Sequence, residues 1–377
     1  MDLERIFRMK EGISSTSYAN NSFLQKKAAD EVMYNTLEAI ERVYLDLTPD
    51  TMTIADLGCS SGPNTLSIIK DMIKTISKNS QHIFYPLPQF QISLNDLPTN
   101  DFSTISNALP QFLEDLDKEM EHVGRPDIAI NAYPCSFYGR LFPDDSMHFI
   151  YSSNSLHWLS KVPPELYNDK GESINQGNVY ISEFSSPAVS EAYFKQFQED
   201  FSLFLQSRYT ELHPGGQMVL IFLGRIGPDH VDRGNSFFWE LLTQSLATLL
   251  TKGEIEKEKF DSYHAPFYAP SKDEIEELVK KNSSFQLHKL EMFQIEKKHH
   301  ADNQISYGTA IAKTVRAIQE PMLIHHFGIG EGALHTLFEA YGRLVDEEMA
   351  KEEIKPVTFS LVLRKLFMGE QQMLRSC

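Results

Sequence analysis

The sequence predicts an α/β protein in which a mostly parallel, seven-stranded sheet carries a helical cap. Two observations predict this fold class. Short apolar runs with strand character alternate with longer stretches of helical periodicity, which is the pattern of a parallel sheet with crossover helices. Three helix-rich segments are also longer than any connection between parallel strands requires. A chain of 377 residues is long enough to bury the large core that such a fold needs.

Seven apolar runs are the expected strands. They lie at residues 52–55, 90–94, 127–131, 147–152, 217–223, 285–294 and 357–363. The run at 217–223 is nearly all apolar, which is typical of a strand buried on both faces. Single helices are expected over residues 26–45, 102–123 with a bend at Pro110, and 187–212.

The chain is expected to divide between core and cap. The expected core segments are 31–152, the cofactor-binding half, and 186–224, 284–302 and 353–377. The expected cap segments are 153–185, 225–283 and 303–352. Residues 1–30 are polar and could be disordered, but Tyr18, Phe23 and Leu24 favour a lid that folds back over the sheet edge.

The stretch MTIADLGCSSGPNT at residues 52–65 points to a cofactor site. Asp56 ends a buried strand, Gly58 and Gly62 bracket a tight turn, and Pro63 suits the first position of the following helix. Strand, glycine turn and helix are how an α/β sheet receives an adenosine-bearing cofactor at its carboxyl edge.

The details of this turn favour S-adenosylmethionine over a nucleotide. Ser60 replaces the second glycine of a dinucleotide fingerprint, and no Lys-Ser/Thr pair follows Gly62 to make a P-loop. A second acid, Asp96, closes the next strand. Paired strand-end acids can hold ribose hydroxyls or a cation, and S-adenosylmethionine has a ribose, a positive charge and no phosphate. The alternative is an ordinary turn in which Asp56 only caps a helix.

Composition excludes several classes of partner. A net charge of −17 argues against nucleic acid and against an anionic membrane surface. Cys59, Cys135 and Cys377 form no CxxC pair, so they suggest neither a disulfide framework nor a zinc site. The N-terminal stretch has no apolar run typical of a signal peptide, and no segment reads as a bilayer span. A cytoplasmic location is therefore expected.

Several long motifs in fixed order resemble the plant SABATH methyltransferases. They are SxSYAxNS at 15–22, DLGCSSGPNT at 56–65, LNDLPxNDF at 94–102, SFYGRLFP at 136–143 and SLHWLSxVP at 155–163. The resemblance runs nearly end to end. The family includes salicylate, benzoate, jasmonate, indole-acetate and loganate carboxyl methyltransferases and the N-methyltransferases of the caffeine pathway.

The resemblance implies a class I methyltransferase core, often as a homodimer, and a set of residues that bind S-adenosylmethionine. Asp96 would take the ribose hydroxyls, and the lid residues Tyr18 and Ser22 would close over the methionine part. The full expected set is Tyr18, Ser22, Asp56, Gly58, Cys59, Asn64, Asp96, Leu97, Ser136 and Phe137.

The resemblance also implies that Gln25 and Trp158 grip the carboxylate of a small acid. The expected substrate-binding set is Lys10, Gln25, His157, Trp158, Phe238 and Trp239. Residues expected to shape the pocket are Asn154, His157, Phe238, Val315 and Pro356. Taken without the family, Trp158 and His157 could be core residues, and Phe238 and Trp239 could simply pack a cap helix.

Some members of the family hold a magnesium ion near the cap. The matching positions here are Asn175, Asp261, Tyr263 and His264. The family more usually has Phe and Asn at the last two positions, so this chain departs from the pattern there.

The expected chemistry needs no catalytic acid or base. A carboxylic acid is already ionised at neutral pH, so it can attack the methyl group directly. The protein has to align the reacting atoms, and orientation alone can supply as much as about 7–11 kcal/mol of the barrier. The neutral donors of Gln25 and Trp158 suit this task because they bind the carboxylate without a salt bridge.

The predicted function is methyl-ester formation on a small plant acid, resembling benzoate or salicylate, jasmonate, or an iridoid acid. N-methylation of a xanthine is the alternative within the family. A nicotinamide dehydrogenase is disfavoured by the missing glycine fingerprint. A small-molecule sensor would keep the acid pocket but would not need a methyl donor.

Overall fold

The computed structural model describes residues 6–367, except 13, 122, 123, 125, 283, 284 and 296–304. Its centre is a seven-stranded sheet with the order β3-β2-β1-β4-β5-β7-β6. The strands are β1 (Thr51–Leu57), β2 (Gln89–Asp96), β3 (Ile128–Pro134), β4 (Met147–Ser153), β5 (Leu212–Gly224), β6 (Phe285–Gln294) and β7 (Val357–Lys365). β1 to β5 pair in parallel, whereas β7 runs antiparallel to both β5 and β6. The predicted mostly parallel sheet is confirmed. Cys377 lies outside the described residues.

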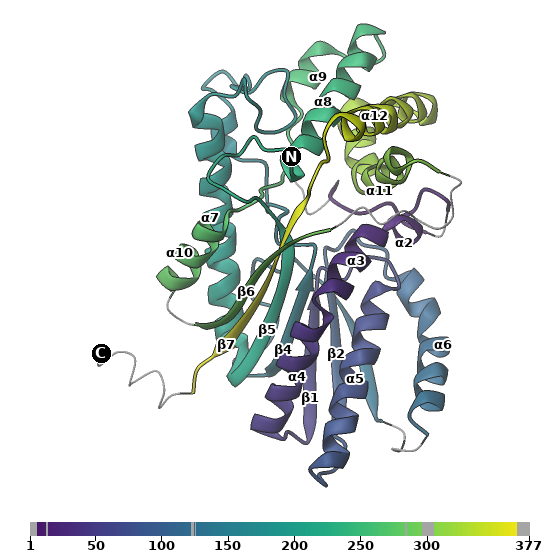
Figure 1. Ribbon diagram of the computed structural model, residues 1–377, viewed down its shortest axis with the longest axis vertical. Coiled ribbons are helices and arrows are strands. Elements are labelled where there is room, and N and C mark those ends of the chain that lie inside the picture. The colour runs from purple at the N-terminus through teal and green to yellow at the C-terminus, as the bar shows by residue number, and fades with distance from the viewer. Residues whose placement is uncertain are drawn as a thin grey trace.

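Helices cover both faces of the sheet (Figure 1). α4 (Met33–Leu47), α5 (Asn64–His82) and α6 (Ser103–Glu119) lie on one face, and α7 (Pro187–Glu211) and α10 (Lys272–Asn282) lie on the other. Successive strand residues point to opposite faces. On β5, Val219 packs into the cluster with α4 and α5, whereas Leu220 packs into the cluster with α7. Both faces of the central strands are therefore buried, as the apolar run at 217–223 predicts.

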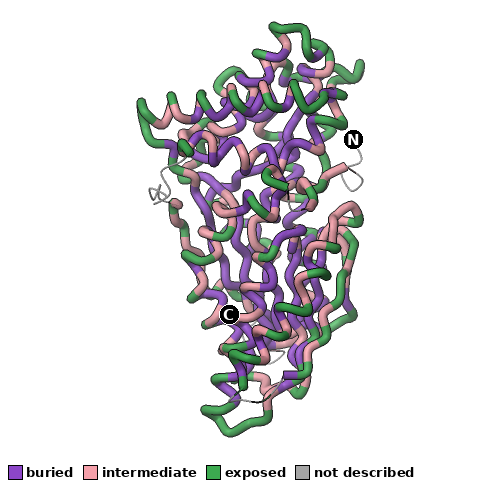
Figure 2. Tube along the Cα trace, turned by 90° about the vertical axis from the view of Figure 1, so that its right-hand side faces the viewer, coloured by how far each residue is buried: buried purple, intermediate pink, exposed green. Residues whose placement is uncertain are grey.

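The cap lies over one edge of the sheet (Figure 1). Its helices are α2 (Tyr18–Asn21), α3 (Phe23–Glu31), α8 (Asn235–Thr251), α9 (Lys257–Ser262), α11 (Tyr307–Phe327) and α12 (Glu331–Lys351), and a short 3-10 helix (Pro164–Leu166) lies between β4 and α7. Buried residues continue from the strands into the cap helices (Figure 2). Cap residues such as Leu242 and Leu337 share one apolar cluster with Leu220 of β5, so core and cap pack as one body.

One expected helix is interrupted in the structure, and the helix-rich segment near the C-terminus contains two helices. The helix expected over residues 26–45 is instead α3 and α4, which meet at Val32. No glycine or proline marks that break in the sequence. The helix-rich segment 303–352 divides at Gly328, which ends α11 with φ +71°, a conformation that favours glycine.

The N-terminal lid folds back over the sheet edge, as its aromatic residues predict. The Lys10 N–H donates to Ala317 O of α11 at 2.7 Å, and Thr314 Oγ1 of α11 donates to Asn21 O at 2.9 Å. The Lys10 ammonium also pairs with Glu320 at 2.6 Å. The lid is therefore tied to α11 rather than to the sheet alone.

Within the part of the chain that the structure describes, no helix combines the length and apolarity needed to cross a membrane.

Close approach of α11 and α12 gives a test of the cap. A Cβ at Gly308 would lie 2.0 Å from the Gly342 carbonyl oxygen, which belongs to the facing helix backbone. Gly308→Ala should therefore destabilise the protein by about 1–3 kcal/mol, because the two helices must move apart. Gly332→Ala is the matched control, since nothing lies within 4 Å of a Cβ there. The melting temperatures of the two variants are compared by thermal unfolding. Equal melting temperatures for Gly308→Ala and Gly332→Ala would contradict the close packing of α11 against α12.

Candidate active site

Gly58 fixes the turn at the end of β1. Its φ is +81°, and a Cβ there would lie 2.0 Å from Ser155 Oγ in the segment after β4. The N–H groups of Gly58 and Cys59 both donate to Asn95 O of β2, at 2.8 and 3.0 Å. The turn therefore brings the ends of β1, β2 and β4 together, and only glycine fits at this position.

Asp96 lies at the end of β2 with its carboxylate held by backbone. Oδ2 accepts from Ser60 N–H at 2.7 Å, and Oδ1 accepts from Leu97 N–H at 2.8 Å. Burial raises the pKa of Asp96 to about 6, although these two hydrogen bonds lower it. A fixed acceptor of this kind can receive hydroxyl groups of a ligand.

Asp56 lies at the end of β1, beside the first turn of α5. Its Oδ2 accepts from Thr65 Oγ1 at 2.6 Å. Burial, together with the nearby Asp96, raises the pKa of Asp56 to about 7. Two buried acids at neighbouring strand ends create a place where a cationic ligand would be stabilised.

Three adjoining cavities surround these residues. The turn cavity lies against Asp56, Gly58, Cys59 and Asn64, and the strand-end cavity lies against Asp96, Leu97, Ser136 and Phe137. The large cavity, of about 520 Å³, lies under the cap. Tyr18 and Asn154 line all three, so the cavities meet at these two side chains.

The large cavity has an aromatic wall from the cap and the segment after β4. Trp158 lies edge-on to Trp239, with ring centroids 6.1 Å apart, and to Phe267 at 5.6 Å. The ring centroids of Phe7 in the lid and Trp158 lie 5.0 Å apart, and Phe7 lines the strand-end cavity. The five residues expected to shape a pocket all line this cavity: Asn154, His157, Phe238, Val315 and Pro356. An apolar ligand body would fit this wall.

His157 is a neutral hydrogen-bond donor. The Leu223 N–H donates to its Nδ1 at 3.2 Å, so the ring proton is on Nε2. Burial lowers the pKa of His157 to about 3. The side chain therefore carries no charge at neutral pH and does not serve as a base there.

Gln25 and Trp158 lie where the large cavity meets the two smaller ones. Gln25 lines both the large and the turn cavity, and its buried Oε1 has no hydrogen-bond partner within the described part of the chain. Trp158 lines the large and the strand-end cavity. Tyr138 Oη holds the Trp158 backbone by donating to its carbonyl oxygen at 2.5 Å. The lid and the segment after β4 thus bring together two side chains that are 133 residues apart.

Two predicted site residues do not line these cavities. Ser22 is buried behind the turn, where its Oγ accepts from Asn64 Nδ2 at 3.1 Å. Lys10 pairs with Glu320 and ties the lid to α11.

The four positions proposed for magnesium are occupied by bonds within the protein. Asp261 pairs with Lys257, and Asn175 Oδ1 accepts from Ser185 Oγ at 2.7 Å. Tyr263 Oη donates to Gln319 Oε1 at 2.8 Å, and His264 Nε2 bonds Ser173 Oγ at 2.7 Å. These contacts engage one candidate ligand atom of each residue, so the four residues would have to exchange these partners to bind magnesium.

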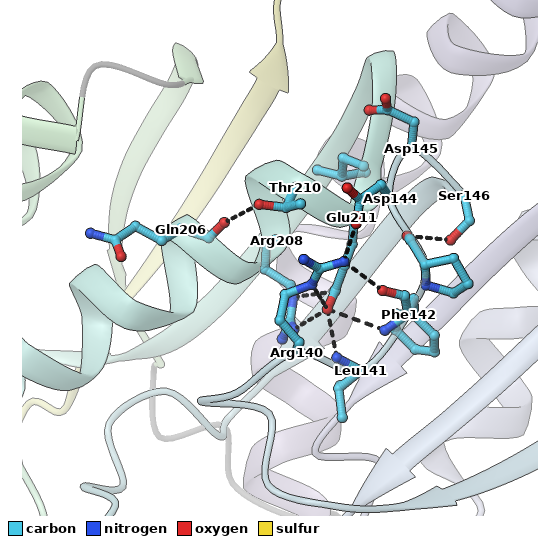
Figure 3. Close-up of polar contacts among 12 residues, drawn as sticks. Arg140, Leu141, Phe142, Asp144, Asp145, Ser146, Gln206, Arg208, Thr210 and Glu211 are labelled. Atoms are coloured by element: carbon cyan, nitrogen blue, oxygen red, sulfur yellow. Dashed lines mark hydrogen bonds and ion pairs between the residues drawn. The ribbon is translucent and has the colours of Figure 1, made fainter.

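A buried ion pair lies behind the strand-end cavity and was not predicted from the sequence. Arg208 donates to Phe137 O at 2.7 Å and to Gly139 O at 2.8 Å, while pairing with Glu211 at 2.8 Å. Figure 3 shows Glu211 pointing to the backbone of Leu141 and Phe142, whose N–H groups donate to its Oε1. The pair fixes the segment that carries Phe137. An Arg and a Glu three residues apart are common on exposed helices, so spacing alone does not mark them.

Comparison with known proteins assigns the chain to a family. A family model described as SAM dependent carboxyl methyltransferase matches residues 4–366. The chain is 41% identical over 372 residues to probable jasmonic acid carboxyl methyltransferase 2 of Theobroma cacao, covering 97% of this chain and 100% of that protein. It is 39% identical to salicylate carboxymethyltransferase of Clarkia breweri, covering 94% and 96%. A solved structure of loganic acid methyltransferase with SAH superposes with a TM-score of 0.82 at 32% identity, covering 96% and 99%.

The chain therefore belongs to the S-adenosylmethionine-dependent carboxyl methyltransferases, and the resemblance to the SABATH family is confirmed. The class I methyltransferase fold is confirmed by the same superposition. The protein is a methyl-ester-forming enzyme of this family.

The raised pKa of Asp96 gives a prediction for cofactor binding. Only the ionised carboxylate accepts fully from ligand hydroxyls, so affinity for S-adenosylhomocysteine should fall as the pH drops below about 6. Asp96→Asn should remove this pH dependence of affinity. It should also weaken binding by roughly 1.5–3 kcal/mol at pH 8, because a charged acceptor is lost. Titration calorimetry at a series of pH values measures the affinity of both proteins for S-adenosylhomocysteine. Asp101→Asn, outside the three cavities, is the control. An unchanged profile in Asp96→Asn would remove Asp96 from the site.

Proposed function

We propose that this protein forms the methyl ester of a small plant carboxylic acid with an apolar body. The observation that carries the proposal is the meeting of three cavities at Tyr18 and Asn154. A methyl donor held in the two smaller cavities would present its methyl group to an acid held in the large one.

The donor side is proposed to bind S-adenosylmethionine. Asp96 would accept from the ribose hydroxyls, with Leu97, Ser136 and Phe137 around the adenine. Asp56, Cys59 and Asn64 would face the methionine part, where the two buried acids favour positive charge. Bound here, S-adenosylmethionine supplies the methyl group.

The acid side is proposed to bind through neutral donors. The carboxylate would accept from the indole N–H of Trp158 and the amide of Gln25, leaving its second oxygen free to attack. No proton has to move, because the acid is already ionised. His157 would remain a neutral neighbour rather than a base. The apolar wall excludes water, which strengthens these hydrogen bonds.

The body of the acid is proposed to lie against Trp239, Phe238 and Phe267. The named relatives include jasmonate, salicylate and benzoate carboxyl methyltransferases, which supports a substrate that is a small carboxylic acid. A volume of about 520 Å³ also falls within the usual range of small-molecule sites.

A homodimer and a cytoplasmic location stay predictions. Magnesium also stays a prediction, and the proposed chemistry has no step for it because the reacting oxygen is already anionic.

Variants at the two donors test the carboxylate site. Gln25→Ala should lower kcat/KM by about 1–3 kcal/mol, because one hydrogen bond to the carboxylate is lost. Trp158→Ala should be more damaging, since it removes both a donor and a wall. Trp158→Phe keeps an aromatic ring and should fall between wild type and Trp158→Ala. Trp239→Phe measures the loss of wall packing without loss of a carboxylate donor, because Trp239 lines the large cavity but neither smaller one, so its effect should be smaller than that of Trp158→Phe.

The measurement is turnover of one panel of carboxylic acids and one panel of xanthines, with S-adenosylhomocysteine affinity followed in parallel. Cofactor affinity should change little in these variants. Full activity of Gln25→Ala on an acid would show that the lid does not contribute to the carboxylate site. Turnover of xanthines without acids would replace the proposal by the N-methylation alternative.

A further inference from the structure

The large cavity contains a polar group far along the chain from the carboxylate donors. Gln319 of α11 lines this cavity and is completely buried. Among the residues that the structure describes, its amide Nε2 has no hydrogen-bond partner. A buried amide N–H without a partner is costly to a folded protein, so it marks a place where a ligand can supply the missing acceptor.

Tyr263 sets which end of this amide is available. Its hydroxyl donates to Gln319 Oε1 at 2.8 Å, and the ring is buried beneath the cap. With the oxygen engaged, Gln319 presents its N–H group as a donor and not its carbonyl as an acceptor.

The surroundings of Gln319 limit the chemistry of the acceptor. Of the other α11 side chains that line the cavity, Ile311, Val315 and Ile318 are apolar, Tyr307 adds a ring, and the Thr314 hydroxyl already donates to Asn21 O. The amide itself is neutral. A second charge on the ligand would therefore be desolvated against an apolar wall, whereas an uncharged oxygen would be satisfied by one hydrogen bond.

Resting on the proposed function, we propose that Gln319 is a specificity residue that selects acids with a second, uncharged oxygen acceptor, such as a ketone. The carboxylate binds at Gln25 and Trp158, and the carbonyl oxygen accepts from Gln319 Nε2. Tyr263 is a positioning residue that holds the amide in this orientation. An acid without the second oxygen leaves the buried N–H unpaired and is methylated less efficiently.

The test compares acids that differ only in the second oxygen. Decanoic and cyclohexylacetic acids are each assayed against their oxo derivatives, with the carbonyl placed at successive carbons. Wild type should prefer at least one oxo acid over its parent by about tenfold or more in kcat/KM, the size of one hydrogen bond to a buried amide. The carbonyl position that gives the preference measures the reach from the carboxylate to Gln319.

Three variants connect the preference to this residue. Gln319→Leu should bring the ratio of oxo acid to parent close to one, and Tyr263→Phe should give an intermediate ratio because the amide can then turn over. Gln217→Leu is the matched control: its Nε2 is also buried and unpartnered, but it lies on β5 and does not line the cavity. This variant should keep the wild-type ratio.

The outcomes separate this inference from the proposed function. Equal kcat/KM for every oxo acid and its parent in wild type would overturn the role of Gln319 while leaving ester formation intact. A preference that survives Gln319→Leu would overturn it as well. Failure of wild type to methylate any acid of either series would instead contradict the proposed function itself.

Discussion

The site depends on the attachment of the N-terminal lid to α11. Glu320 of α11 pairs with Lys10 at 2.6 Å and with Arg316 at 2.7 Å, and its own side chain is only 8% exposed. The ion pairs of a buried carboxylate are costly to break, because removal of one cationic partner leaves its negative charge poorly compensated. The lid places Tyr18 at the junction of the three cavities and Gln25 at the rim of the large one. The lid therefore forms part of the wall of the proposed acid site, beside the cap helices.

The two halves of the site use opposite electrostatics. The cofactor side buries two acids, and burial raises the pKa of Asp96 to about 6 and that of Asp56 to about 7. The same carboxyls ionise near pH 4 in the unfolded chain, so the free folded protein loses stability as the pH rises from about 4 to about 7. A cationic ligand offsets that cost. On the proposed acid side, the donors Gln25 and Trp158 are neutral and burial lowers the pKa of His157 to about 3, while the charged residues that line the large cavity are Lys26, Lys27 and Asp30. A carboxylate can bind there without the strong salt bridge that would reduce its reactivity.

Much of the fold could be predicted from the sequence because its signals are local. The apolar run at 217–223 and the glycine turn after Asp56 each fix a conformation from neighbouring residues alone. The break at Val32 could not be predicted, since no helix-breaking residue marks it. The same holds for Arg208 with Glu211 and for Tyr263 with Gln319, because burial and long-range partners decide what these side chains do. Family motifs predicted Gln25 and Trp158 as carboxylate donors, and both line the large cavity, whereas spacing alone would have left both as ordinary packing residues.

The central claim is that the lid and the segment after β4 together bind a carboxylate beside the methyl donor. A crystal structure of the protein with S-adenosylhomocysteine and an acid that it methylates tests this claim most directly. The account predicts one carboxylate oxygen within about 3 Å of both the Trp158 indole nitrogen and the Gln25 amide nitrogen, with the other facing the cofactor sulfur. A carboxylate bound to a lysine or arginine outside the large cavity, with Gln25 turned away, would contradict it.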